Sequence, residues 1–349
     1  MRRRLTLAGA AGTLAVVLLS APALACGGLI GPNGAVNLLR TTTFAGYHEG
    51  IEHYVTAFQF AGGGGAFGSI TPLPGVPTKV EKGGDWTLQR LIQETEPVPE
   101  AALFSLGSAA GAADRAKVIM EVQIDALDIT VLEGGGDAVG LWAKEHGFRL
   151  PPDSPEVLDF YAKRSPIFLA AVFDADRAAQ REQGLGDGTP VHITIPTTNP
   201  WVPLRILALG KSGQEVVQAD VYMLTDIKPA ILPAPTGRNG IGLAHSAPAS
   251  DLLLADLRSD RGMEWIPEKG WLTKVEVDGF ASQIGYDLAV DASGQGTPSR
   301  VAAGLALPPA EQVVRELASP RFALALSVFL LGALVIVGLA TRRPPTLAR

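Results

Sequence analysis

The sequence contains almost no cysteine. Cys26 is the only one in 349 residues, so no disulfide can form within the chain. A chain of this length buries enough apolar surface to be stable without crosslinks. We therefore expect a fold that is held together by its hydrophobic core alone.

Basic residues are scarce in the body of the chain. Six of the 29 lysines and arginines lie in the terminal segments, at positions 2–4, 342, 343 and 349. The remaining 23 stand against 35 acidic residues, which gives the body a net charge near −12. Nucleic acids and anionic phosphate surfaces require basic patches on their partners, so we expect neither as a partner.

Motifs with the spacing of a known catalytic, cofactor or metal site are also missing. Residues 48–53 (HEGIEH) resemble a zinc-protease signature, but the two histidines are five positions apart instead of the four that place both on one helix face. We interpret them as a solvated turn before a strand. The glycine turn at 134–140 has Val139 where a dinucleotide-binding turn needs its last glycine. The sequence therefore predicts no cofactor and no metal, and it identifies no catalytic residue.

The remaining histidines do not change this interpretation. His245 and Ser246 lie close to Asp251 and supply the residue types of a hydrolytic triad, but they fall in a Gly/Ala-rich loop without a nucleophile elbow. His192 alternates with apolar residues, so we expect it to point outward from a strand. His146 is expected to cap the C-terminus of a helix.

An uncharged apolar segment follows the N-terminus. Arg2, Arg3 and Arg4 precede the run from Leu5 to Leu19, and residues 23–25 (ALA) supply small residues at the two positions that a signal peptidase reads. The run is too short to span a bilayer. We predict a cleaved signal peptide over residues 1–25.

A second apolar segment lies near the C-terminus. Residues 322–340 carry no charge, and a helix of this length, at about 1.5 Å per residue, spans the hydrocarbon core of a bilayer. Arg342 and Arg343 set its topology, because arginines beside a span mark the cytoplasmic side. We predict a transmembrane helix over 319–341 and a cytoplasmic tail over 342–349. The chain would then be a single-pass protein of the cell membrane, with its N-terminus outside.

Cleavage after Ala25 makes Cys26 the first mature residue, which raises the question of lipidation. Ala23 and Leu24 hold, in swapped order, the residue types that a lipoprotein signal requires. A transmembrane anchor also makes a lipid redundant. We expect ordinary cleavage, with lipidation of Cys26 as the alternative.

The body of the chain, residues 26–290, has the pattern of an α+β domain. Alternating apolar residues predict strands at 54–60, 117–124, 191–195 and 217–223, and more continuous apolar runs predict buried strands at 168–173 and 202–209. Asp85, Asp137 and Ser154 are expected to begin three short helices. Residues 233–250 show little periodicity before a β segment at 272–290, and residues 291–318 are expected to form a linker.

The order of these segments resembles a bacterial family known as domain of unknown function 2330. The resemblance spans about residues 25–290 and rests on ACGG at 25–28, the strand at Tyr54, ITPLPGVP at 70–77, the Trp142 helix, GFRLP at 147–151, SPIFL at 165–169 and PLR at 203–205. Members of that family often carry a second cysteine shortly after the first, where this chain has Ile30 and Gly31, so a disulfide of that kind is absent. The resemblance implies an exported, often membrane-anchored protein and supplies no activity.

We therefore expect a mainly antiparallel α+β ectodomain that serves as a structural or binding module of the cell envelope. Its partners would be membrane lipid, through the C-terminal helix, and an envelope protein or polysaccharide. The alternative is an extracytoplasmic hydrolase whose site is assembled only in three dimensions. An enzyme should have a deep pocket with converging polar residues, whereas a binding module should offer an open surface.

Overall fold

The computed structural model describes residues 28–32, 34–35, 41–59, 67–96, 118–181 and 188–309. The predicted signal peptide, Cys26, the predicted transmembrane helix, Arg342 and Arg343 all lie outside these residues. Within the described ranges, no helix is long and apolar enough to cross a membrane.

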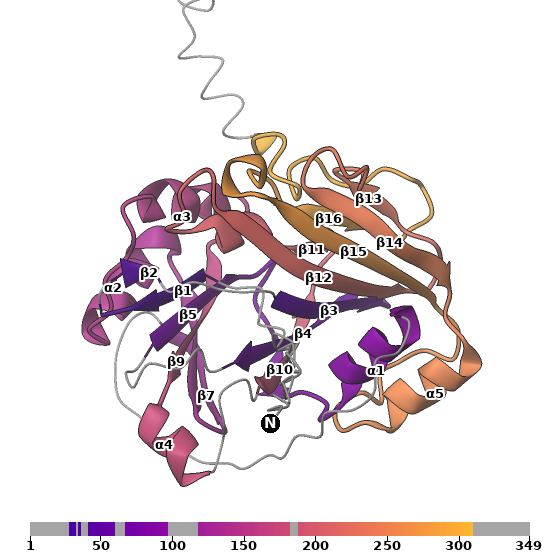
Figure 1. Ribbon diagram of the computed structural model, residues 1–349, viewed down its shortest axis with the longest axis horizontal. Helices are drawn as coiled ribbons and strands as arrows, with labels where there is room; N and C mark the ends of the chain where they lie inside the picture. Colours follow the sequence, from indigo (N-terminus) through magenta and orange to yellow (C-terminus); the bar gives the residue numbers. More distant parts are fainter. Residues whose placement is uncertain are drawn as a thin grey trace, which may run out of the picture.

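A seven-stranded sheet runs through the centre of the molecule, with strands in the order β14-β15-β12-β3-β4-β10-β6 (Figure 1). Its strands are β3 (Thr41–His48), β4 (Ile51–Gln59), β6 (Lys79–Lys82), β10 (Gly188–Pro196), β12 (Val216–Thr225), β14 (Ile241–Pro248) and β15 (Trp271–Phe280). Neighbouring strands are antiparallel except β3 and β12, which run parallel. The strands predicted at 54–60, 191–195 and 217–223 are confirmed in β4, β10 and β12.

A second sheet has six antiparallel strands in the order β2-β1-β5-β9-β8-β7. They are β1 (Gly28–Gly31), β2 (Gly34–Ala35), β5 (Phe67–Pro72), β7 (Val118–Ile124), β8 (Leu127–Glu133) and β9 (Ile167–Phe173). A small third sheet joins β11 (Trp201–Val202), β16 (Leu288–Asp291) and β13 (Ala230–Leu232). The expectation of a mainly antiparallel α+β domain with a few short helices is confirmed for the described residues.

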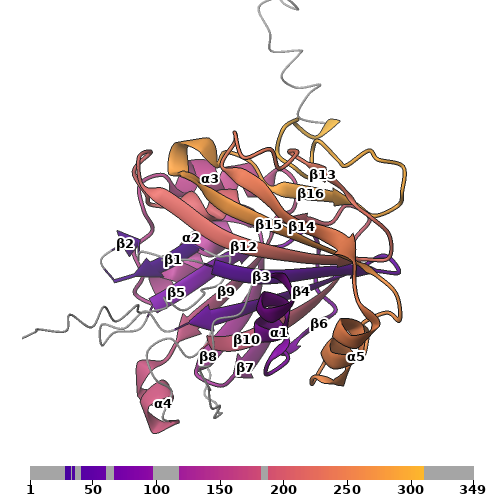
Figure 2. The ribbon, with the colours of Figure 1, turned by 45° about the vertical axis from the view of Figure 1, so that its right-hand side comes forward.

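The two large sheets pack face to face, and helices cover their outer faces (Figures 1 and 2). The helices are α1 (Thr87–Thr95), α2 (Gly135–Glu145), α3 (Ser154–Ala162), α4 (Ala175–Gln180) and α5 (Asp251–Ser259). Side chains of β3 and β4 alternate between two apolar clusters, because successive residues of a strand point to opposite faces. Ala45 and Tyr54 pack in the core between the sheets, whereas Phe44 and Val55 pack with α1 and α5. The seven-stranded sheet is therefore buried on both faces.

The three predicted helices are present, but their N-caps differ from the expected residues. Helix α1 begins after Trp86, helix α2 after Gly134 and helix α3 after Asp153. The carboxylate of Asp260 accepts hydrogen bonds at 3.0 Å from the backbone N–H groups of Asp85 and Trp86. The backbone that leads into α1 is thus held by a residue that is distant in the sequence and close only in the fold.

Two segments differ from the sequence-based expectation. Residues 202–209 form no long strand: β11 ends at Val202, and Arg205–Ala208 form a 3₁₀ helix. The reason is Pro203, which has no N–H group for a strand ladder. Residues 233–250, expected to be irregular, contain the edge strand β14, whose register shifts between Leu243 and His245.

Packed structure extends past residue 290, where the sequence analysis placed the end of the domain. Ala302 is 5% exposed and Ala303 is fully buried in the cluster beneath α2 and α3. Arg164 donates a hydrogen bond to the carbonyl of Ala302, and the N–H of Asp287 donates to the carbonyl of Ala303. The first part of the expected linker therefore contributes to the core.

Candidate functional site

Three of the five histidines lie in a row across the seven-stranded sheet. Five neighbouring strands contribute one titratable residue each: Glu81 from β6, His192 from β10, His53 from β4, His48 from β3, and Asp226 directly after β12. Nδ1 of His53 is 3.0 Å from Nε2 of His192. Nδ1 of His48 is 2.7 Å from Oδ1 of Asp226, and Nδ1 of His192 is 3.6 Å from Oε1 of Glu81. We call these five residues the histidine row.

Trp265 covers the middle of the histidine row. Its ring is stacked on His53 with a centroid distance of 3.8 Å and an interplanar angle of 4°. It also stacks on Phe44 at 5.9 Å. Gly46 makes this position available, because a Cβ atom there would overlap the Trp265 ring. The indole is thus fixed between β3 and the imidazole of β4.

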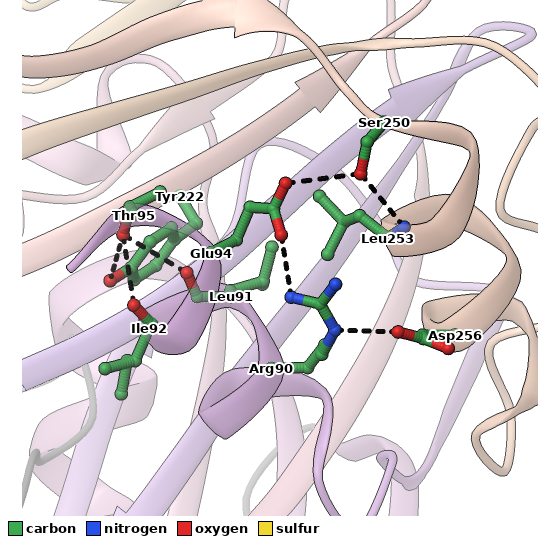
Figure 3. Close-up of polar contacts among 9 residues, drawn as sticks. All are labelled: Arg90, Leu91, Ile92, Glu94, Thr95, Tyr222, Ser250, Leu253 and Asp256. Carbon is green, nitrogen blue, oxygen red and sulfur yellow. Dashed lines mark hydrogen bonds and ion pairs between the residues drawn. The ribbon is translucent and has the colours of Figure 1, made fainter. Parts of the chain in front are cut away.

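Helix α5, which precedes Trp265, is held against α1 by polar contacts (Figure 3). Arg90 of α1 bridges Glu94 and Asp256, with both N–O distances at 2.8 Å. Ser250 caps α5 by accepting from the N–H of Leu253 at 3.1 Å, and its hydroxyl donates to Glu94 at 3.2 Å. These contacts fix the start and middle of α5 against α1, and Asp260 fixes its end. The position of α5 in turn determines where the following segment places Trp265 over the sheet.

Burial makes the central histidine pair uncharged at neutral pH. Burial, together with the smaller effects of the nearby imidazoles of His192 and His48, lowers the pKa of His53 to about 3. Burial likewise lowers the pKa of His192 to about 4, although the carboxylate of Glu81 partly offsets the effect. One imidazole therefore donates a neutral hydrogen bond to the other. The Nδ1 atom of His192 has no hydrogen-bond partner within the described part of the chain.

The structure corrects two expectations about these histidines. Glu49 and Gly50 do form an exposed turn, with φ angles of 50° and 81° that suit a two-residue hairpin. Residues Glu52 and His53, however, are buried rather than solvated, and His192 is 2% exposed instead of pointing into solvent. The physical reason is that the helices and the Trp265 segment cover the face that the alternation pattern assigns to solvent.

Glu52 is a second buried titratable group, on the opposite face of β4. Burial raises the pKa of the carboxyl and a hydrogen bond from the backbone N–H of Trp201 partly offsets the effect, which leaves the pKa at about 8. The sheet therefore carries a neutral carboxylic acid on one face and neutral imidazoles on the other at mildly acidic pH.

A buried ion pair joins α3 to the end of the domain. The fully buried carboxylate of Asp287 accepts hydrogen bonds from the Tyr161 hydroxyl at 2.9 Å, from the N–H groups of Leu204 and Arg205 at 2.8 and 3.0 Å, and from Arg164 at 2.5 Å. Every oxygen of this carboxylate has a partner, so the arrangement serves structure.

Among the hollows on the surface of the described residues, two stand out, and neither has a histidine in its lining. One, of about 600 Å³, lies between the glycine turn at 134–137 and helix α3. The other, of about 690 Å³, lies among Gly50, residues 196–199 and residues 299–302. Among the described residues, no group of three or more His, Cys, Asp or Glu side chains is arranged to hold a metal ion.

The triad-like residues of the sequence are not assembled into a site. Ser246 Oγ accepts a hydrogen bond from the indole of Trp271 at 2.9 Å, and Asp251 begins helix α5. His245 lies opposite Lys274 across the β14–β15 pair. The histidine pair, which the sequence analysis missed, had one readable signal: β10 (GTPVHITIP) carries no charged residue on either face.

Several solved structures resemble the chain weakly. The crystal structure of a mutated baculovirus P35 after caspase cleavage matches 74% of this chain and 98% of that chain, with 7% sequence identity and a TM-score of 0.37. The caspase-8/P35 complex matches 72% and 90% of the two chains, with 9% identity and a TM-score of 0.33. Baculovirus P35 itself matches 72% and 91%, with 8% identity and a TM-score of 0.35. Similarity at this level supports no argument about this chain.

The sequence comparison with protein families is decisive, whereas no curated protein matches the chain significantly. The bacterial family that the order of segments resembles matches residues 20–289, which is most of the chain. This chain belongs to the family described as an uncharacterized protein conserved in bacteria, DUF2330.

Proposed function

We propose that this protein is an exported, membrane-anchored binding module of the bacterial cell envelope. The observation that carries the proposal is the burial of His53 and His192, the central pair of the histidine row. The two imidazoles that the fold brings together lie under Trp265, with His53 7% and His192 2% exposed. Neither imidazole lines either of the two hollows described above.

Hydrolysis is the alternative, because the fold does bring two imidazoles together. A general base must reach the proton that it removes and needs a pKa near the working pH. His53 and His192, with pKa values of about 3 and about 4, are covered and too weakly basic for that role at neutral pH. A hydrolase would require Trp265 to move away from the pair.

The membrane anchor is part of the proposal and rests on the apolar segment at 322–340 with Arg342 and Arg343 after it. Protease added to intact, wall-stripped cells should degrade the ectodomain and leave only the anchor with its short tail. Full protection of the ectodomain would rule out this topology.

Binding and hydrolysis are separated by one assay. The full-length protein, reconstituted in nanodiscs, is incubated with dye-labelled polysaccharide sacculi and sedimented. We expect the protein to appear in the pellet and no dye in the supernatant. Dye release that disappears in His53→Gln would favour the hydrolase, and the absence of protein from the pellet would contradict the role as a polysaccharide-binding module.

A further inference from the structure

The hollow between α2 and α3 has the features of a ligand site. Its floor is one face of α3, where Ser154, Leu158 and Ala162 follow each other at four-residue spacing. The first turn of α2 forms one wall, and residues 150–152 form another. The hollow is lined by two helix N-termini and by apolar side chains.

The start of α2, which forms one wall of the hollow, carries no side chains because its residues are glycines. A Cβ atom at Gly135 would lie 2.9 Å from the Cβ of Ala162, and one at Gly136 would lie 3.2 Å from the Cβ of Leu158. The N–H groups of Gly134 and Gly135 both donate to the carbonyl of Pro166 at 3.1 Å. The next N–H groups of the first turn have no carbonyl partner within the helix, so they are available to a ligand.

A buried hydroxyl in the floor provides the second, independent observation. Ser154 is 1% exposed, and its Oγ has no hydrogen-bond partner among the residues that the structure describes. Leaving a buried polar group unsatisfied costs about 1–3 kcal/mol. A hydroxyl group of a ligand in the hollow would satisfy it.

The charges around the hollow select a neutral ligand. Asp137 and Asp159 both line it, and Asp159 is paired with Lys163 at 2.9 Å. The charge of Asp137, which has no ion-pair partner in the described part of the chain, and the excess of acidic over basic residues oppose an anion. The positive end of the α2 dipole opposes a cation.

We propose that the hollow between α2 and α3 binds a neutral saccharide unit. Sugar hydroxyls both donate and accept, so they match the carboxylate of Asp137, the N–H groups of α2 and the hydroxyl of Ser154. The apolar face of a sugar ring packs against Leu150, Leu158 and the prolines. This inference rests on the proposed function and names the ligand class that the binding module recognises.

The test uses full-length protein in nanodiscs and a trimer of β-linked N-acetylglucosamine as the probe. Binding is measured by isothermal titration calorimetry and by saturation-transfer NMR of the sugar. We expect Ser154→Ala to weaken binding by about five- to tenfold, the loss of one buried hydrogen bond. Asp137→Asn should weaken it to a similar extent, because the carboxylate is the stronger acceptor.

Asp251→Asn is the matched control, since Asp251 occupies the first turn of α5 as Asp137 does in α2. It should bind the trimer like the unmodified protein, and all variants should melt at similar temperatures. Binding that both Ser154→Ala and Asp137→Asn leave unchanged would overturn the assignment to this hollow. Binding of inorganic phosphate in place of the sugar would overturn the ligand class.

The outcome is distinguishable from failure of the proposed function. Protein that sediments with sacculi but does not bind the trimer would contradict the saccharide site and leave the binding module intact. Protein that neither sediments nor binds would contradict both.

Discussion

Nδ1 of His53 lies 3.0 Å from Nε2 of His192, although 139 residues separate the two in the sequence. They meet because β4 and β10 are neighbours, and Trp265 excludes solvent from the contact. The pair is a neutral hydrogen-bonded couple inside the protein, and this property makes the stability of the fold sensitive to acid.

Acid should destabilise the protein through this pair. The folded-state pKa values of about 3 and about 4 lie below the ordinary 6.5, so the unfolded chain binds protons that the folded chain does not. The free energy of unfolding should therefore fall as pH drops from 6.5 towards 4, by up to about 1.4 kcal/mol per pH unit for each histidine. Urea unfolding at several pH values measures this slope.

A double variant isolates the contribution of the pair from that of other groups. His53→Gln with His192→Gln keeps a neutral donor and acceptor but removes both titrations, so the slope below pH 6.5 should become shallower. His245→Gln, on the edge strand β14, should leave the slope as it is. An unchanged slope in the double variant would contradict the burial of the pair.

The buried carboxyl of Glu52 should lower the stability of the fold at high pH. Its folded-state pKa of about 8 lies above the ordinary 4.5, so the folded chain holds a proton that the unfolded chain releases. Stability should therefore decrease as pH rises from 4.5 to 8. At pH 8, Glu52→Gln should be more stable than the unmodified protein by roughly 2–4 kcal/mol, because an amide needs no proton and still accepts from Trp201.

Glu49→Gln provides the control for this prediction. Glu49 lies in the same hairpin, with a side chain that is 81% exposed. The control should change stability by less than about 0.5 kcal/mol, as is usual for surface positions. A loss of stability in Glu52→Gln at pH 8 would mean that the charged carboxylate is needed.

Gly46 should tolerate no side chain. A methyl group there overlaps the Trp265 ring, which is itself packed on His53 and Phe44. Gly46→Ala should cost about 1–3 kcal/mol, the usual range for overpacking a core. Gly242→Ala on β14 is the control, because a Cβ atom there meets nothing within 4 Å. Equal melting temperatures for the two variants would show that Trp265 is loosely held.

Truncation should reveal where the domain ends. A chain that ends at residue 290 loses the buried Ala302 and Ala303 together with the carbonyl that Arg164 binds. It should aggregate or melt without cooperativity. A chain that ends at residue 310 keeps these contacts and should melt cooperatively, as measured by circular dichroism. Cooperative melting of the shorter chain would show that residues 291–309 are a linker and not part of the domain.

The local sequence pattern predicted the strands and helices of this fold better than it predicted what packs against them. Alternation located β4, β7, β10 and β12 because each has at least one face in an apolar cluster. The alternation in β10 shows which side chains share a face of the strand, but it does not show whether the second face is covered by other parts of the protein. For this reason it wrongly placed His192 in solvent. The cover comes from Trp265, seventy-odd positions later, in a segment without periodicity.

Long-range polar contacts were beyond sequence reasoning for a similar reason. Asp260 accepts from the N–H of Trp86, just before α1, across 174 residues. Asp287 accepts from Arg164, just after α3, across 123 residues. Nothing in the residues around Asp260 or Asp287 indicates a distant partner. The glycine turn at 134–137 was noted for its composition, but the hollow also needs Ser154, which only the packing of α3 on α2 brings near.

The parallel pairing of β3 with β12 constrains how the chain acquires its structure during synthesis. Until β12 has been made, β3 can pair only with β4, and the central sheet stays open along one edge. Contacts between segments so far apart in the chain form slowly, because a large loop must close before they contribute. The N-terminal half therefore emerges from the ribosome without a finished core. A chain whose core is completed this late leaves apolar strands exposed for longer during synthesis, and exposed strands of this kind are prone to aggregate.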